Sequence, residues 1–156
     1  MTEPSGTVDV FQLNVSVDAV VLPMPSTPPP LMVGSVGERV LRATLPYVDA
    51  WNCWYAWFGN TAAGFAEQNS RVSALAQECG RDPSQIARSA TVFVAVDGAE
   101  SSRPHADLRP ITGSSTAIAD RLNEFETVGV DELILVVDPI TEDSIRAFGE
   151  VVYDLG

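Results

Sequence analysis

The sequence contains no lysine. All nine of its basic residues are arginines, and they face 21 acidic residues, so that the net charge of the 156-residue chain is −12. Nucleic acids and anionic membranes are bound through basic surfaces, so this balance argues against both as partners. The sequence also lacks any apolar run near the roughly 20 residues that span a bilayer. Met1–Gly6 has neither the positive charge nor the apolar stretch of a signal peptide, which predicts a cytoplasmic protein.

Cysteine and histidine are too scarce to predict a disulfide framework or a metal site. Cys53 and Cys79 form no CxxC motif and have no histidine near them in the sequence, so we expect two free thiols that pack as small hydrophobic groups. The single histidine, His105, lies in an acidic loop, where we expect it to be exposed. The sequence also lacks a Walker loop and a Ser/His/Asp arrangement, and the catalytic residues are therefore unknown.

What the sequence does contain is a repeated pattern of short apolar runs and amphipathic helices. The composition is 46% hydrophobic, enough for one globular domain. The expected strands are Leu31–Val33, Ala50–Cys53, Ala90–Val96 and Glu132–Val137. The expected helices are Gly37–Val48, Asn60 or Thr61 to Cys79, Ser114 or Ser115 to Val128, and Thr141 to Leu155. This alternation predicts an α/β fold of four parallel βα units, which is half of a (β/α)₈ TIM barrel. A small open doubly wound sheet is the alternative.

The chain divides by composition into two parts. Residues 1–30 form an N-terminal arm and connector, with a possible short strand at Val8–Val17 and an extended segment containing five prolines from Pro23 to Pro30. Residues 31–156 form the half-barrel. Within it, Ala90–Val96 is apolar on both faces, as a buried parallel strand should be. The side chains expected to face inward from the last helix are Ile145, Phe148, Val152 and Leu155.

The candidate binding site is the turn between the first strand and the first helix. The residues of this turn are Gly34, Ser35, Val36 and Gly37. Backbone N–H groups at a helix N-terminus are unpaired and carry partial positive charge, so such a turn can hold a phosphate. Trp51 and Asn52, at the end of the next strand, are expected to line the same site. The alternative is a purely structural turn, with Trp51 packed at the barrel rim.

Several segments, in order, resemble motifs of one enzyme superfamily. These segments are Pro29–Arg42, Asp49–Asn52, Gly80–Pro83 with Ile86, and Gly129–Leu135 followed by Asp138-Pro139. They resemble the C-terminal half of the bacterial luciferase-like superfamily of flavin- and deazaflavin-dependent TIM-barrel oxidoreductases and monooxygenases. The resemblance implies coenzyme F420, or alternatively FMN, as cofactor, and a small organic molecule as substrate. The family has two adjacent glycines where this chain has Gly34-Ser35.

The family's first four strands have no counterpart here, which leaves a second hypothesis open. The chain could be a non-catalytic fragment or a partner subunit whose barrel is completed by a homodimer or by another chain that supplies the N-terminal half. By itself it is expected to be poorly active, because the resemblance supplies no acid/base residues. The aromatic run Trp54–Phe58 is expected to fill the core or an interface.

Overall fold

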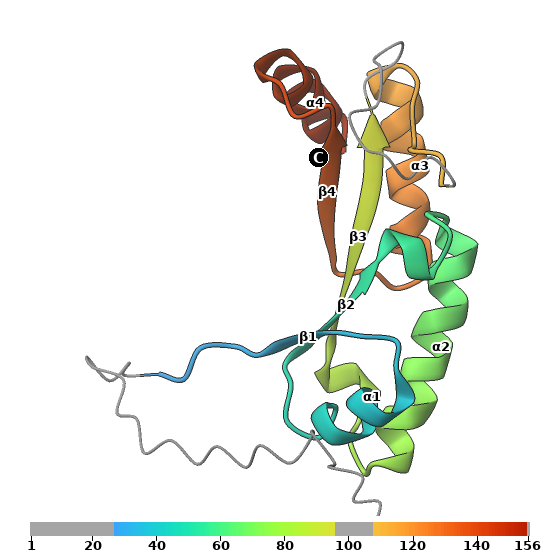
Figure 1. Ribbon diagram of the computed structural model, residues 1–156, viewed down its shortest axis with the longest axis vertical. Coiled ribbons are helices and arrows are strands. Elements are labelled where there is room, and N and C mark those ends of the chain that lie inside the picture. The colour runs from blue at the N-terminus through green and yellow to red at the C-terminus, as the bar shows by residue number, and fades with distance from the viewer. Residues whose placement is uncertain (1–26, 96–107, 156) are drawn as a thin grey trace, which may run out of the picture.

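The computed structural model describes residues 27–95 and 108–155, and within them strands and α-helices alternate (Figure 1). The strands are β1 (Met32–Gly34), β2 (Ala50–Trp54), β3 (Ala87–Ala95) and β4 (Glu132–Asp138). The helices are α1 (Glu38–Thr44), α2 (Ala62–Glu78), α3 (Ser115–Thr127) and α4 (Glu142–Asp154), with the short 3₁₀ turns η1 (Tyr55–Trp57) and η2 (Pro83–Gln85). The expected strand at Val8–Val17 and the residue His105 lie outside the described residues.

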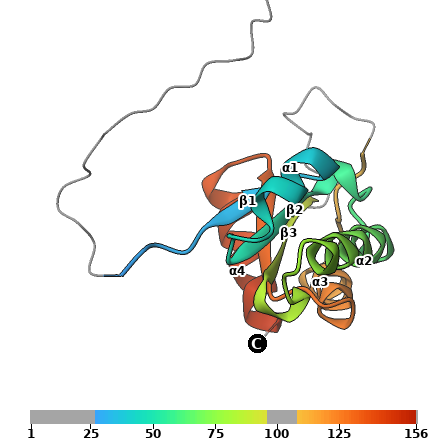
Figure 2. The same ribbon diagram turned by 90° about the horizontal axis from the view of Figure 1, so that it is seen from below.

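The sheet is parallel throughout, and its spatial order β1-β2-β3-β4 is the order of the chain. A doubly wound sheet requires a reversal of strand order, so that alternative is wrong. Consecutive helices contact one another, α1 with α2, α2 with α3, and α3 with α4. In Figure 2 they follow one another around the outside of the sheet. The structure thus confirms four successive parallel βα units, an arrangement consistent with part of a TIM barrel.

The helix ends follow the predicted capping residues. Thr61, Ser114 and Thr141 are N-caps, and each side-chain oxygen accepts a hydrogen bond from the backbone N–H three residues later, at 3.1–3.2 Å. Gly80 and Gly129, with φ of 76° and 83°, follow α2 and α3 in the left-handed conformation that favours glycine. Helix α1 is shorter than expected.

The early end of α1 has a local cause. The helix ends at Thr44, whereas the pattern predicted that it would reach Val48. Pro46 has no backbone N–H with which to continue the helical ladder. Leu41, Leu45 and Val48 nevertheless bury their side chains together, as their spacing predicted.

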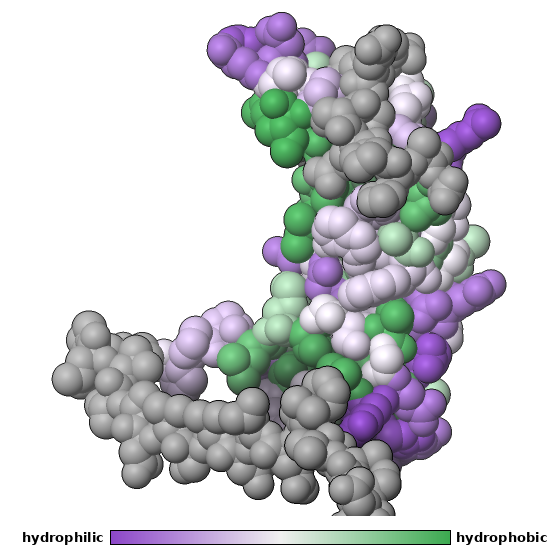
Figure 3. Space-filling model, in the orientation of Figure 1, coloured by the Kyte–Doolittle hydropathy of each residue, from purple (hydrophilic) through white to green (hydrophobic). Residues whose placement is uncertain are grey.

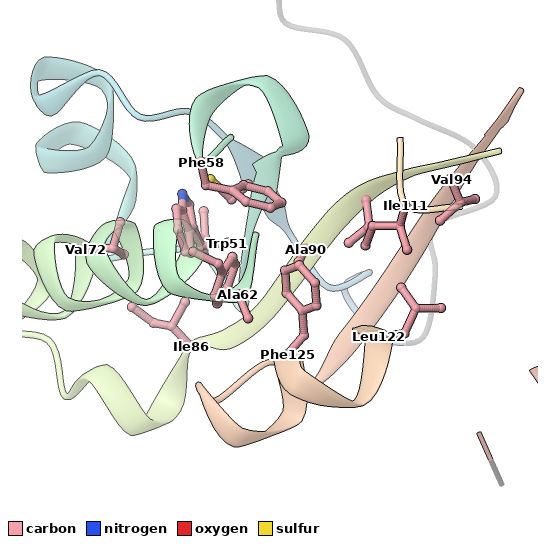
Figure 4. Packing of buried hydrophobic residues seen from close by; sticks show 14 of the residues in the cluster. Trp51, Phe58, Ala62, Val72, Ile86, Ala90, Val94, Ile111, Leu122 and Phe125 are labelled. Atoms are coloured by element: carbon pink, nitrogen blue, oxygen red, sulfur yellow. The ribbon is translucent and has the colours of Figure 1, made fainter. Parts of the chain in front are cut away.

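The core lies between the sheet and the helices and is rich in aromatic rings (Figure 4). Phe58, Phe65 and Phe125 form three edge-to-face pairs with ring centroids 5.7–6.3 Å apart. Trp51 of β2 contacts Phe65 of α2 at 5.7 Å. Such pairs add about 0.5–1.5 kcal/mol each beyond the area they bury. The aromatic cluster therefore fixes α2 and α3 on the sheet.

The C-terminal part of β3 extends beyond the end of β2, and there the side chain of Asn60 pairs with the β3 backbone in place of a strand. Asn60 accepts a hydrogen bond from Phe93 N (2.9 Å) and donates one to Phe93 O (2.8 Å). Ile111 continues the ladder, because Phe93 O also accepts from its N–H and Ala95 N donates to its carbonyl. Asn60 has φ of 58°, a conformation that asparagine tolerates better than most residues. The loop after β2 is thereby held against the sheet.

Two sequence predictions about packing are corrected by the structure. Strand β3 begins at Ala87, three residues earlier than predicted, and its first part carries buried hydroxyl groups rather than apolar side chains on one face. In α4, Phe148 is buried as expected, but Ile145 and Val152 are 54% and 57% exposed, and Val151 is buried instead. Among the described helices, α3 is the one that packs closely beside α4, and part of the apolar surface of α4 is exposed.

Candidate functional site

The predicted phosphate-binding turn connects β1 to α1 at the carboxyl edge of the sheet. Leu41 N donates to Gly37 O (3.0 Å), and this is the first intrahelical hydrogen bond of α1. The N–H groups of Glu38, Arg39 and Val40 come before it and have no intrahelical acceptor. Gly34 and Gly37 are exposed, while Ser35 and Val36 are half-buried. The turn is therefore accessible and rich in backbone donors.

Trp51 determines how one peptide group of this turn is oriented. Its indole Nε1 donates a hydrogen bond of 2.8 Å to the carbonyl oxygen of Ser35. The bond between Ser35 and Val36 is trans, so its C=O and N–H point in opposite directions. Because the carbonyl points toward the indole in the core, the N–H of Val36 points away from the core. An indole on the neighbouring strand thus holds the Val36 N–H directed away from the core.

Ser35 fits the position at which the luciferase-like superfamily has the second of two adjacent glycines. The positive φ angles of the described residues lie at Asn60 and at glycines outside the turn, so the turn requires no left-handed residue. The hydroxyl oxygen of Ser35 accepts a hydrogen bond from Gly37 N at 3.1 Å. This bond stabilises the turn without a ligand, and it places a polar side chain beside the backbone donors.

The structure places Trp51 differently from the expected position. The residue is fully buried and packs among the helices, so it supports the turn from behind and presents no surface to a ligand. Side chains alternate along a strand, and Trp51 and Cys53 occupy the helix-facing side of β2. Trp51 is therefore a core residue that packs behind the turn.

Asn52 lies on the opposite side of β2, next to Gly34 in the register of the sheet. Its Nδ2 donates to the hydroxyl oxygens of Ser89 (2.9 Å) and Thr91 (3.0 Å). The Thr91 hydroxyl also approaches Asn52 Oδ1, at 3.1 Å. Its amide is thus engaged by β3, and Asn52 joins the two strands across the face that lies inside a complete barrel.

Sequence reasoning missed Ser89 and Thr91. Both are buried, at 1% and 3% exposure, and both contact Asn52. Their spacing of two residues is the signal that two hydroxyls share one strand face. Next to them, Tyr55 stacks on Phe93 with ring centroids 5.1 Å apart, and Trp54 contacts Tyr55 at 4.6 Å. The barrel-inner face thus carries the polar cluster Asn52, Ser89 and Thr91, followed toward the carboxyl ends of the strands by a row of aromatic rings.

The charges around the turn are compatible with an anion. Glu38, in the first turn of α1, is paired with Arg42 (2.9 Å), which also binds Glu78 (2.7 Å). These two carboxylates raise the pKa of Arg42 above its ordinary value. Arg39, one residue after Glu38, makes no ion pair within residues 27–95 and 108–155. Its cationic charge is therefore available near the turn.

The two cysteines differ in burial and in reactivity. Burial raises the pKa of the Cys53 thiol to about 12, so this thiol is not a nucleophile at neutral pH. Cys79 is partly exposed, contrary to the expectation that both cysteines are buried. In the described part of the chain no three metal-ligating side chains gather at one point, and no helix there is long and apolar enough to cross a membrane.

Residues 3–116 match the sequence model of the luciferase-like monooxygenase family, which is more than half of the chain. The chain belongs to this family. The matched region contains the turn Gly34–Gly37, β2 and β3. A search of curated proteins found no match.

Solved structures of similar fold include two F420-dependent enzymes. One is an F420-dependent secondary alcohol dehydrogenase in complex with an F420-acetone adduct (TM-score 0.67, 15% identity). The match covers 88% of this chain and 52% of the dehydrogenase chain. The other is the coenzyme F420-dependent tetrahydromethanopterin reductase from Methanopyrus kandleri (TM-score 0.58, 16% identity). The match covers 79% of this chain and 48% of the reductase chain. At these identities the likeness shows the fold. The chain spans about half the length of these proteins.

Proposed function

We propose that this luciferase-like chain binds the phosphate of coenzyme F420 at the turn Gly34–Gly37 and forms the C-terminal, cofactor-holding half of an oxidoreductase. The observation that carries the proposal is the hydrogen bond from Trp51 to the Ser35 carbonyl, which directs the Val36 N–H outward. Membership of the family and the F420-dependent structural neighbours support the choice of cofactor. FMN, which also carries a phosphate, is the comparator.

The residues of the turn fit a phosphate group. The donors are backbone N–H groups, which suit phosphate and need no deprotonation. The nearest carboxylate in sequence, Glu38, is neutralised by Arg42, while Arg39 adds positive charge. We propose that Val36 N–H and the first N–H groups of α1 bind the phosphate, with Asn52 holding the neighbouring strand in place.

The bound deazaflavin would supply hydride transfer to or from a small organic substrate. The contribution of this chain is to hold the cofactor. Trp51 keeps a donor oriented, the pairing of Asn52 with Thr91 keeps β2 in register with β3, and the row Trp54, Tyr55 and Phe93 excludes water from the barrel-inner face. No acid/base residue of this chain is assigned to the hydride transfer.

The test is a titration of the purified full chain with F420, followed by the cofactor's fluorescence, with FMN in parallel. Replacing Ser35 with Asp places a carboxylate beside the phosphate, and the repulsion should weaken F420 binding at least roughly tenfold. Ser35→Gly restores the family's glycine pair and should retain binding. Gln85→Asp adds the same charge in η2, which precedes β3 at the opposite edge of the sheet, and should leave the affinity unchanged.

Two outcomes would contradict the proposal. One is saturable binding that Ser35→Asp does not weaken, because the phosphate would then lie elsewhere. The other is the absence of binding of either cofactor by a folded chain at high micromolar concentration. Tighter binding of FMN than of F420 would keep the site and change the cofactor.

A further inference from the structure

Exposed apolar side chains are concentrated at the two ends of the sheet. Within the described residues, ten large hydrophobic side chains are more than a third exposed. At one end, in or next to β1 and α1, they are Leu31, Met32, Val40 and Tyr47. At the other end, in or next to β4 and α4, they are Ile134, Ile140, Ile145, Val152 and Tyr153. The two central βα units contribute only Trp57 to this set.

This distribution differs from the scatter expected on a free surface. We call the group Leu31, Met32, Val40 and Tyr47 the β1 edge. We call the group Ile134, Ile140, Ile145, Val152 and Tyr153 the β4 edge. In Figure 3, apolar residues gather below α4 and again near β1, on the hollowed side of the molecule. Among the described residues, each edge combines a strand that has a sheet neighbour on one side only with exposed apolar side chains on the adjacent helix or the loop next to it. A polypeptide that adds another βα unit beside either edge would cover both features.

The charges of the two terminal helices are complementary. Helix α1 contains Arg39 and Arg42 against one acidic residue, Glu38, and Arg39 is not in an ion pair in the described chain. Helix α4 contains four acidic residues, Glu142, Asp143, Glu150 and Asp154, against one basic residue, Arg146. The pair of Arg146 with Glu142 leaves Asp143 and Glu150 without an ion pair among the described residues. A basic α1 therefore suits an acidic α4 as its neighbour.

We propose that the β1 edge of one copy of this chain binds the β4 edge of a second copy, so that two chains close an eight-stranded barrel by two-fold symmetry. All strands are parallel, and a rotation of 180° about the barrel axis preserves their direction. Strand β4 then pairs with β1 of the partner in parallel, and the same contact occurs twice. The proposal rests on the fold and the edges, and is independent of the cofactor.

The experiment is sedimentation equilibrium of the full chain between about 1 and 200 μM, a range in which dissociation constants near micromolar are measurable. The expected result is a reversible dimer of the 16.7 kDa chain. Met32→Glu with Val40→Glu modifies the β1 edge, and Ile145→Glu with Val152→Glu modifies the β4 edge. Each pair should raise the dimer dissociation constant roughly 100-fold. Trp57→Glu, the matched change at an exposed apolar residue away from both edges, should have no effect.

Mixing the two modified chains tests the head-to-tail arrangement. In the mixed dimer, one interface joins both modified edges and the other joins two intact edges, so part of the dimerisation should return. Monomers of the unmodified chain at 200 μM would overturn the proposal. It would also be overturned if either modified chain dimerised normally alone, since β1–β1 or β4–β4 pairing would then operate. Circular dichroism verifies that each variant is folded.

Discussion

Replacing Trp51 with Phe separates the two roles that the structure gives this side chain. The indole fills part of the core against Phe65, and its Nε1 binds the Ser35 carbonyl at 2.8 Å. Phenylalanine retains most of the ring but loses the donor. We expect the loss of the hydrogen bond to cost about 1 kcal/mol. The smaller ring adds about 1–2 kcal/mol of lost packing, by comparison with large-to-small core substitutions.

The expected total is a destabilisation of about 2–3 kcal/mol, equivalent to a fall of roughly 5–10 °C in Tm for a chain of this size. Urea unfolding followed by circular dichroism measures it without relying on tryptophan fluorescence. Trp57→Phe is the matched control, because Trp57 is 40% exposed, and it should change the free energy of unfolding by less than about 0.5 kcal/mol.

The same variant tests the proposed phosphate site. Without the indole the Ser35–Val36 peptide is free to rotate, and the Val36 N–H no longer has a fixed direction. We expect F420 binding to weaken by roughly tenfold, the value of one hydrogen bond to a charged group. The reasoning is refuted if Trp51→Phe unfolds at the same urea concentration as the unmodified chain, or if it loses stability while its F420 affinity is unchanged.

Two other predictions follow from packing and burial. Gly64→Ala should destabilise the chain by more than about 2 kcal/mol in urea unfolding, because a Cβ there would lie 2.0 Å from the Phe58 carbonyl oxygen. Gly149→Ala in α4 places its methyl group in open space and should stabilise the chain by about 0.5–1 kcal/mol. Equal changes in the free energy of unfolding for the two variants would contradict the structure. At pH 8, iodoacetamide should modify Cys79 in the folded chain but not Cys53, because burial raises the pKa of the Cys53 thiol to about 12. Mass spectrometry of the intact protein should show one adduct without urea and two adducts in urea. Rapid modification of Cys53 in the folded chain would contradict its burial.

Local signals predicted the elements of the fold well. Capping residues such as Thr61 and Thr141, and the stop signal Gly129, act within one helical turn, so a single sequence shows them. The parallel arrangement also followed from the alternation of apolar runs and helices. The inward face of α4 was predicted only in part, with Phe148 buried but Ile145 exposed. Hydrophobic spacing shows which side chains share a helix face but not which elements pack against that face.

The candidate site was predicted only in part. A turn at Gly34–Gly37 is visible in the sequence, and the described geometry has suitable backbone donors there. The direction of Trp51 was not predicted, since a shift of one residue in a strand moves a side chain to the opposite face. The bond between Asn52 and Thr91 joins residues 39 positions apart, and the register of two strands fixes it. The division of the chain at residue 30 stays a prediction.

The parallel arrangement of the strands also affects the stoichiometry of binding. Every carboxyl end in the described sheet lies at one edge, and the turn Gly34–Gly37 lies at that edge. A barrel made of two copies would therefore carry two such turns on the same rim, facing each other across the axis. Two tricyclic rings directed to the centre of one rim would compete for the same space. Saturation at one cofactor for every two chains would then be a sign of the closed ring.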